Sequence, residues 1–223
     1  MCGRYSLYKL EPLIRLFPSL AFPPVLKPRY NIAPTQPILA LANDDPTRFD
    51  YFIWGLIPSW AKDRSIGNRM INARAETLAE KPAFRTALQR RRCLIPADGF
   101  YEWRKEPDGT KSPMYLRMKS GTPFMFAGLW DRWHGPDGED LRSCTIITTS
   151  PNSFVKDIHD RMPVIIPPGK YNPWLEGGNP SELLQSYPAE EMEAHLVSRT
   201  VNNPRNETPQ CAEAIAENHN GNP

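Results

Sequence analysis

Apolar positions along the chain occur in short runs that prolines and turn residues separate. The 25 prolines are about twice the usual share and are spread over the whole length. Alternating or continuous apolar runs bounded by such residues are typical of β-strands. The strands that this pattern predicts span residues 37–41, 49–57, 93–96, 100–104, 113–118, 124–133, 141–149 and 164–166. From residue 93 to 149 the pattern indicates an antiparallel sheet, with Asp108-Gly109 as a hairpin turn.

Helical spacing of apolar residues is confined to short segments. Residues 8–18 carry apolar side chains at helical spacing, and a second helix is predicted over residues 82–91, where Pro82 suits the first turn. Arginines at the end of this second helix complement its dipole, which explains them without nucleic acid. Further short helices are expected over residues 152–156, 181–185 and 188–196. The polar segment 62–69 has no periodicity and is expected to be exposed.

No internal repeat or linker divides the chain, so its 223 residues predict a single α+β domain. We expect a mainly antiparallel, barrel-like β-sheet with flanking short helices over residues 1–203. From residue 204 onward the sequence is polar and rich in Pro and Asn. This composition predicts a disordered tail over residues 204–223.

Composition limits the classes of function. A hydrophobic content of 40% with 23% charged residues is ordinary for a globular protein. No apolar run is long enough to cross a bilayer, and the N-terminus lacks the pattern of a secretory signal. We therefore expect no membrane association and a reducing compartment, either the cytoplasm with its nucleoid or the nucleus. A net charge of +2 neither requires nor excludes a polyanionic partner.

The four cysteines lie far apart and lack the spacing of a zinc site. Free thiols are the prediction, with Cys93 and Cys144 in the core and Cys211 in the polar tail. The sequence also lacks a Gly-rich phosphate loop and a dinucleotide fingerprint. No metal and no organic cofactor are therefore expected.

Cys2 is the first candidate for chemistry. Removal of Met1 would leave an α-amine and a thiol on adjacent carbons, with ordinary pKa values of about 8 and about 8.5. Such an amine forms a Schiff base with an aldehyde, and the thiol can then close a five-membered thiazolidine. In an arbitrary protein Cys2 would simply be the residue after Met1. Only features further along the chain favour the chemical interpretation.

Several later residues could supply proton transfer and binding. Glu102 lies among aromatic residues, where burial would raise the pKa of its carboxyl, although the local sequence fits a solvated edge-strand residue better. His159 has a pKa suited to proton transfer, and capping by the neighbouring aspartates explains it equally well. Asn72 and Arg74 would share a strand face that suits a phosphate, a sugar hydroxyl or a buried salt bridge. Trp60, beside two cations, could stack on a base or pack over the core.

Seven motifs occur in order over residues 2 to about 203, and together they resemble the SOS-response-associated peptidase (SRAP) family. Members of that family bind single-stranded DNA and crosslink to abasic sites. The motifs are Met1-Cys2-Gly3-Arg4-Tyr5, Arg29-Tyr30-Asn31-Ile32-Ala33-Pro34, Trp54-Gly55 with Pro58, Ile71-Asn72-Ala73-Arg74-Ala75-Glu76-Thr77, Ala97-Asp98-Gly99-Phe100-Tyr101-Glu102-Trp103, Asp157-Ile158-His159-Asp160-Arg161-Met162-Pro163 and Val197-Ser198.

The resemblance implies a role for each candidate. Cys2 would attack the ring-opened aldehyde of an abasic deoxyribose and end as a thiazolidine crosslink. Glu102 would handle protons at the α-amine, and His159 would assist sugar-ring opening and Schiff-base chemistry. Asn72 would orient Cys2 or the sugar. The implied DNA contacts are Arg4, Arg74 and Arg161 to phosphates, with Trp60, Pro34 and Thr148 at bases or backbone.

The implied partner is single-stranded DNA with an abasic site, bound by a monomer. At position 60 this chain has a single Trp where some members of the family have an adjacent pair, so base stacking there is the least supported contact. Two other functions remain open on the sequence. One is a cysteine peptidase with an N-terminal nucleophile, whose narrowest substrate is its own Met1, and the other is a non-catalytic single-strand binding module. Strand cleavage by β-elimination is expected to be minor, because thiol closure would divert the Schiff base.

Overall fold

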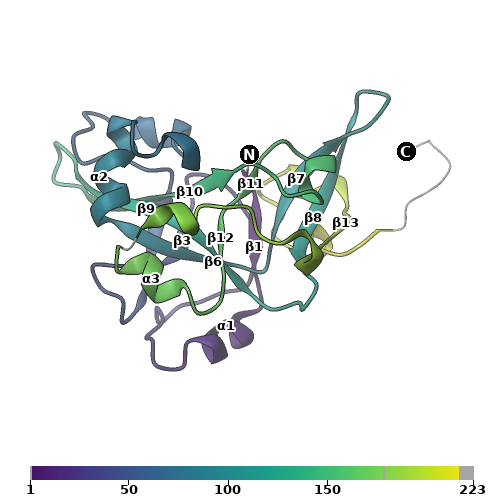
Figure 1. Cartoon of the computed structure of the whole chain (residues 1–223), viewed down its shortest axis with the longest axis horizontal. Coiled ribbons are helices and arrows are strands. Elements are labelled where there is room, and N and C mark those ends of the chain that lie inside the picture. Colours follow the sequence, from purple (N-terminus) through teal and green to yellow (C-terminus); the bar gives the residue numbers. More distant parts are fainter. Residues whose placement is uncertain (1, 178, 216–223) are drawn as a thin grey trace.

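The computed structural model describes residues 2–177 and 179–215, which fold around a closed β-barrel (Figure 1). The barrel strands are β3 (Pro37–Ala42), β4 (Phe49–Trp54), β6 (Arg92–Ala97), β9 (Phe124–His134) and β10 (Asp140–Thr149). Their order is β10-β4-β3-β6-β9, and β9 pairs with β10 again, which closes the ring. All of these pairings are antiparallel except β10 with β4.

Short strands extend the barrel at its rim. β5 (Asn72–Arg74) runs parallel to β10, β11 (Met162–Pro163) pairs with the end of β10, and β12 (Ile165–Ile166) pairs with β9. Most of the expected strands are confirmed, although the strand predicted to reach residue 57 ends at Trp54. In the run 164–166, only Ile165–Ile166 form a strand, β12, and β11 ends before the run at Pro163.

A second, antiparallel sheet packs beside the barrel, on the right in Figure 1. Its order is β13 (Met192–Leu196), β8 (Lys111–Met118), β7 (Gly99–Lys105), β1 (Tyr5–Leu7) and β2 (Arg29–Ile32). The two sheets are continuous in the chain, because β6 of the barrel passes through Asp98 into β7. The expected α+β class with a barrel-like sheet is confirmed, and the N-terminal strand lies centrally between the two sheets.

The helices are short, as expected. They are α1 (Leu10–Leu16), α2 (Pro82–Arg90) and α3 (Tyr171–Leu175), with 3-10 turns at η1 (Arg64–Arg69), η2 (Ala75–Thr77), η3 (Val155–Asp157), η4 (Pro180–Glu182), η5 (Ala189–Glu191), η6 (Arg199–Asn202) and η7 (Pro209–Cys211). Within the described residues, none of the helices has both the length and the hydropathy that a bilayer-spanning helix needs. The segment 62–69 forms η1 and is mostly exposed, with Gly67 buried.

Buried tryptophans fix two irregular segments against the barrel. The indole N–H of Trp54 donates to Ile71 O at 2.9 Å, which holds the segment leading into β5. The indole N–H of Trp174 donates to Cys93 O at 2.9 Å, which holds α3 against β6. The expected burial of Cys93 and Cys144 is confirmed, and all four cysteines are free and buried.

Two sequence predictions about the C-terminal third are wrong. The helix predicted over 188–196 is instead the turn η5 followed by strand β13, which pairs with β8. Its Ala, Glu, Met and Leu residues favour helix, but pairing with a sheet edge overrides that weak preference. Only the turn η4 stands in place of the helix predicted over 181–185.

The disordered tail predicted from residue 204 is also wrong as far as residue 215. The Glu207 carboxylate accepts N–H bonds from Tyr30 and from Asn31, the second at 2.7 Å, and it pairs with Arg29 at 2.7 Å. Cys211, placed by the sequence in a polar tail, is fully buried. A polar segment is ordered here because its carboxylate satisfies backbone donors of the edge strand β2. The remainder of the predicted tail, 216–223, lies outside the described residues.

Candidate active site

Cys2 lies beside Glu102 because the pairing of β1 with β7 continues toward the N-terminus. Tyr5 pairs with Phe100, and the Tyr101 N–H donates to Arg4 O at 2.9 Å. Carried on toward the N-terminus, this antiparallel register puts Gly3 opposite Glu102 and Cys2 one residue beyond it, and the Glu102 charge acts on the Cys2 thiol. The Cys2 side chain is fully buried, and its burial, with the Glu102 charge second, raises the pKa of the thiol.

Glu102 is buried, with 3% of its surface exposed. The local sequence favoured a solvated carboxylate on an edge strand, and that interpretation is wrong, because β7 is the central strand of its five-stranded sheet. Burial raises the pKa of Glu102 to about 7. A carboxyl with this pKa exchanges protons readily near neutral pH.

His159 faces Glu102 from the loop before β11. Its Nε2 lies 3.6 Å from Glu102 Oε2, while its Nδ1 lies 3.0 Å from the backbone N of Arg161 and 2.9 Å from Asp160 Oδ1. The Arg161 N–H donates to Nδ1, so the neutral imidazole carries its proton on Nε2, directed at Glu102. Burial lowers the pKa of His159, and the Asp160 charge opposes that shift. The neutral ring therefore has no Nδ1 hydrogen for the Asp160 carboxylate, which pairs with His159 only when the imidazole is protonated.

Asn72 presents an unused acceptor. Its side-chain N–H₂ donates to Ile71 O at 3.0 Å and to Ile146 O at 3.5 Å. Its Oδ1 is buried and has no hydrogen-bond partner among the described residues. Because a buried acceptor without a partner is costly, this oxygen is suited to receive an N–H group from an amine or a ligand.

Arg161, Glu76, Arg74 and Thr148 form one cluster at the end of β10. Arg161 grips Glu76 through both terminal nitrogens, at 2.6 and 2.9 Å, and donates to Thr148 O at 2.8 Å. Thr148 pairs with Arg74 across β10 and β5. The hydrogen bond from Arg161 lowers the pKa of Glu76, and the Arg74 charge acts in the same direction. Two cations therefore flank one carboxylate here.

Arg4 is half-buried and makes internal bonds. Its Nη1 donates to Asn31 Oδ1 and to Val201 O, both at 2.7 Å, and its guanidinium lies 6.0 Å from the centre of the Trp103 ring. The Asn31 N–H₂ in turn donates to the carbonyls of residues 201, 203 and 206. Arg4 therefore ties the N-terminal segment to the C-terminal one, whatever else it binds.

Pro34 and Trp60 lie on separate loops. Pro34 is half-buried just after β2, before Thr35, which has the positive φ of 70°. Trp60 is 60% exposed on the loop after β4. The core-packing alternative for Trp60 is therefore wrong, and its ring is available to a ligand.

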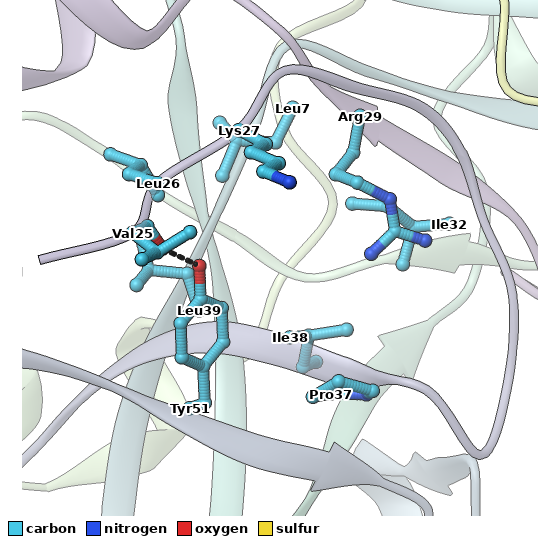
Figure 2. Close-up of a pocket in the computed structure, with 10 residues that line it drawn as sticks. All are labelled: Leu7, Val25, Leu26, Lys27, Arg29, Ile32, Pro37, Ile38, Leu39 and Tyr51. Carbon is cyan, nitrogen blue, oxygen red and sulfur yellow. Dashed lines mark hydrogen bonds between the residues drawn. The ribbon is translucent and has the colours of Figure 1, made fainter. Parts of the chain in front are cut away.

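An open hollow adjoins His159. It has a volume of about 730 Å³ and is lined by Lys105, Pro151, Lys156, Asp157, Ile158, His159 and Asp160. A second cavity of about 320 Å³ lies at the opposite end of β1 from Cys2 (Figure 2), between the segment 25–29 and β3 with β4. Its walls are mainly apolar, and the Tyr51 hydroxyl donates to Val25 O at 2.8 Å across its edge. This second cavity is separate from the catalytic cluster.

The structure thus brings Cys2, Glu102 and His159 together, and separately groups Arg74, Thr148 and Arg161. Sequence reasoning missed several participants, of which the main ones are Asn31, Glu76, Asp160 and Glu207. The first three stand inside recognised motifs but were not singled out. Glu207 had no signal, since it lies in a polar stretch. Within the described residues, no group of three or more His, Cys, Asp or Glu side chains could hold a metal ion.

Known proteins resemble this chain over most of its length. Residues 1–204 match the family model described as SOS response associated peptidase (SRAP). YoqW and YoaM of Bacillus subtilis (strain 168), both named abasic site processing proteins, are 48% and 49% identical over 223 and 228 residues, which cover 96% and 98% of this chain and 100% of theirs. The abasic site processing protein HMCES of Xenopus tropicalis is 35% identical over 73% of this chain and 56% of its own. A solved structure from Bacteroides thetaiotaomicron, 27% identical, superposes with a TM-score of 0.85 over 96% of this chain and 100% of that one.

Proposed function

The chain belongs to the SOS response associated peptidase (SRAP) family, and from this premise we propose that it captures abasic sites in single-stranded DNA covalently through Cys2. The printed names of its relatives, abasic site processing proteins, support the substrate. The observation that carries the mechanism is the buried Glu102, with a pKa of about 7, between Cys2 and His159.

The reaction needs the α-amine and the thiol of Cys2 after Met1 has been removed. The amine nitrogen adds to the C1′ aldehyde of the opened sugar, and the resulting carbinolamine loses water to give a Schiff base. The sulfur then adds to the same carbon, and the thiol proton passes to the imine nitrogen. The product is a thiazolidine, and the balance is protein plus DNA less one water.

Proton transfer in these steps is assigned to Glu102 and His159. With a pKa of about 7, Glu102 accepts a proton from the Cys2 ammonium and returns it to the hydroxyl that leaves as water. The Nε2 of His159, 3.6 Å from Glu102, exchanges that proton with the sugar during ring opening. The free Oδ1 of Asn72 accepts an N–H from the Cys2 amine and holds its lone pair toward the aldehyde.

DNA contacts are assigned to the surface around this cluster. Arg74 is exposed at the rim of the barrel, and Arg161 presents its guanidinium beside Thr148. Guanidinium groups bind phosphates through paired N–H donors. Trp60, which is 60% exposed, offers a ring on which a base can stack. Arg4 contributes through the position it gives the N-terminal segment as well as through its charge.

The same groups allow two side activities. Cys2 and Glu102 could take part in cutting the Met1–Cys2 bond, which would confine a peptidase role to maturation of the chain. The Schiff base could also undergo β-elimination and cleave the strand. We expect this lyase activity to be minor, because the thiol lies on the carbon adjacent to the amine and closes on the imine first.

Intact mass spectrometry tests the proposal. The protein is mixed with single-stranded DNA carrying one abasic site, alongside Cys2→Ala and the matched control Cys211→Ala, which removes a buried thiol away from the site. A heat-stable adduct at the summed mass less one water is expected for the wild type and Cys211→Ala. Absence of that adduct in a wild-type sample whose Met1 is removed would refute covalent capture.

A further inference from the structure

The hollow beside His159 is bordered by lysines. Lys105, at the end of β7, and Lys156, in η3, line it. Lys111 begins β8 and pairs directly with Lys105 across the hairpin. All three side chains are exposed; Lys105 and Lys156 line the concavity beside His159, and Lys111 lies on the neighbouring strand, opposite Lys105.

These ammonium groups lack counter-charges. Several exposed arginines of the chain have carboxylate partners, as Arg132 has Asp140 and Arg64 has Glu139. In the described part of the chain, no ion pair joins Lys105, Lys111 or Lys156 to a carboxylate. Like charges placed directly opposite each other on paired strands are destabilising. Repulsion between Lys105 and Lys111 therefore lowers the stability of the hairpin, and a bound anion would relieve that repulsion.

Lys111 is placed by its pairing with Lys105 in the β7–β8 hairpin, and its charge also acts on Glu102 and His159. Burial raises the pKa of Glu102 and lowers that of His159, and the Lys111 charge lowers both. Lys111 therefore acts on both proton-transferring side chains. Two aspartates also line the hollow, but the Asp160 carboxylate lies 2.9 Å from His159 Nδ1. The hollow itself is lined by two lysines and two aspartates, and Lys111 on the neighbouring strand adds a third ammonium group, so the net charge at this edge is positive and favours an anionic ligand.

We propose that Lys105, Lys111 and Lys156 form a phosphate-binding subsite that holds the DNA backbone on one side of the abasic site. This inference rests on the proposed function and adds the path of the strand away from Cys2. The open shape of the hollow suits a flexible phosphodiester chain, and lysine ammonium groups bind phosphates as point charges without base selectivity. The strand therefore leaves the reacting sugar past His159 over the β7–β8 hairpin.

The test uses oligonucleotides that cannot react. Each carries a tetrahydrofuran abasic analogue, which has no aldehyde, at one end, with flanking nucleotides only on its 5′ or only on its 3′ side. The triple variant Lys105→Gln, Lys111→Gln, Lys156→Gln is compared with the wild type by fluorescence anisotropy over a range of salt concentrations. The control variant Lys81→Gln, Lys119→Gln, Lys170→Gln removes the same charge at exposed positions outside the hollow. Thermal unfolding checks that both variants fold.

The subsite predicts an asymmetric loss. For one of the two oligonucleotides, the hollow variant should bind at least about tenfold more weakly at 0.1 M salt, with the slope of log K against log salt reduced by about 2. The other oligonucleotide and the control variant should stay close to wild type. If the hollow variant lost affinity equally for both oligonucleotides, or the control variant lost as much affinity as the hollow variant, the lysines would attract DNA only through general charge. Either result would overturn the proposed subsite. Unchanged binding by the hollow variant would also overturn it, whereas a wild type that binds neither oligonucleotide refutes the proposed function itself.

Discussion

Replacing Glu102 by Gln should stabilise the protein in a way that depends on pH. The pKa of this carboxyl lies at about 7 in the fold, against an ordinary value of 4.5. Between these values the unfolded chain releases a proton that the folded chain retains, so stability falls as pH rises and levels off above about pH 7. Since one pKa unit corresponds to about 1.36 kcal/mol, the wild type should lose about 3 kcal/mol relative to Glu102→Gln between pH 4 and pH 8.

Urea unfolding at half-unit pH steps from 4 to 8.5 measures this difference directly. The depressed pKa of His159 contributes the opposite slope, and it does so in both proteins, so it largely cancels in the comparison. Glu80→Gln, at an exposed position, is the matched control for replacing a carboxyl by an amide. A difference between wild type and Glu102→Gln that stays constant across this range would show that Glu102 is not held protonated by burial. Glu102→Gln should also slow crosslinking.

Three further predictions concern the surroundings of the site. Glu207→Ala removes an acceptor of two backbone N–H groups of β2 and should lower the free energy of unfolding by about 1–2 kcal/mol in urea titrations. Gly67→Ala places a Cβ 2.7 Å from the Gly55 carbonyl oxygen and should lower the free energy of unfolding by about 1–3 kcal/mol in the same assay. An unchanged unfolding midpoint would show that the backbone shifts to relieve this contact without loss of stability. Glu76→Gln releases the Arg161 guanidinium and should tighten binding of undamaged single-stranded DNA in anisotropy, whereas weaker binding would mean that Glu76 orients Arg161.

Much of the barrel is legible in the sequence because its strands are continuous apolar runs. β6 and β9 are buried along nearly their whole length. A continuous apolar run of this kind between turn residues is compatible with few structures other than a buried strand. The strand β13 is different, because only Met192 is fully buried and the remaining residues are half-buried. Its pairing with β8 is a tertiary fact, and the residue types alone favoured a helix.

The candidate site residues were proposed from motifs, whereas their environments could not be predicted from the sequence. The local sequence around Glu102 gives no indication that two strands lie on each side of β7, and this position causes the burial that raises the pKa. The role of Glu207 was also out of reach, because its partners in β2 lie more than 170 residues earlier in the chain. Nothing in the sequence around a carboxylate in a polar stretch indicates that it makes such a contact.

The burial of Cys2 bears on the order of chemical steps. Because burial raises the pKa of the thiol, a thiolate is scarce at neutral pH, and the sulfur is a weak first nucleophile. A peptidase mechanism would need that thiolate to attack a carbonyl. The proposed crosslinking does not, because in it the amine attacks first, with Glu102 assigned as its proton acceptor, and the sulfur then closes on the electrophilic imine carbon. We infer that the buried thiol favours capture of an aldehyde over hydrolysis of a peptide.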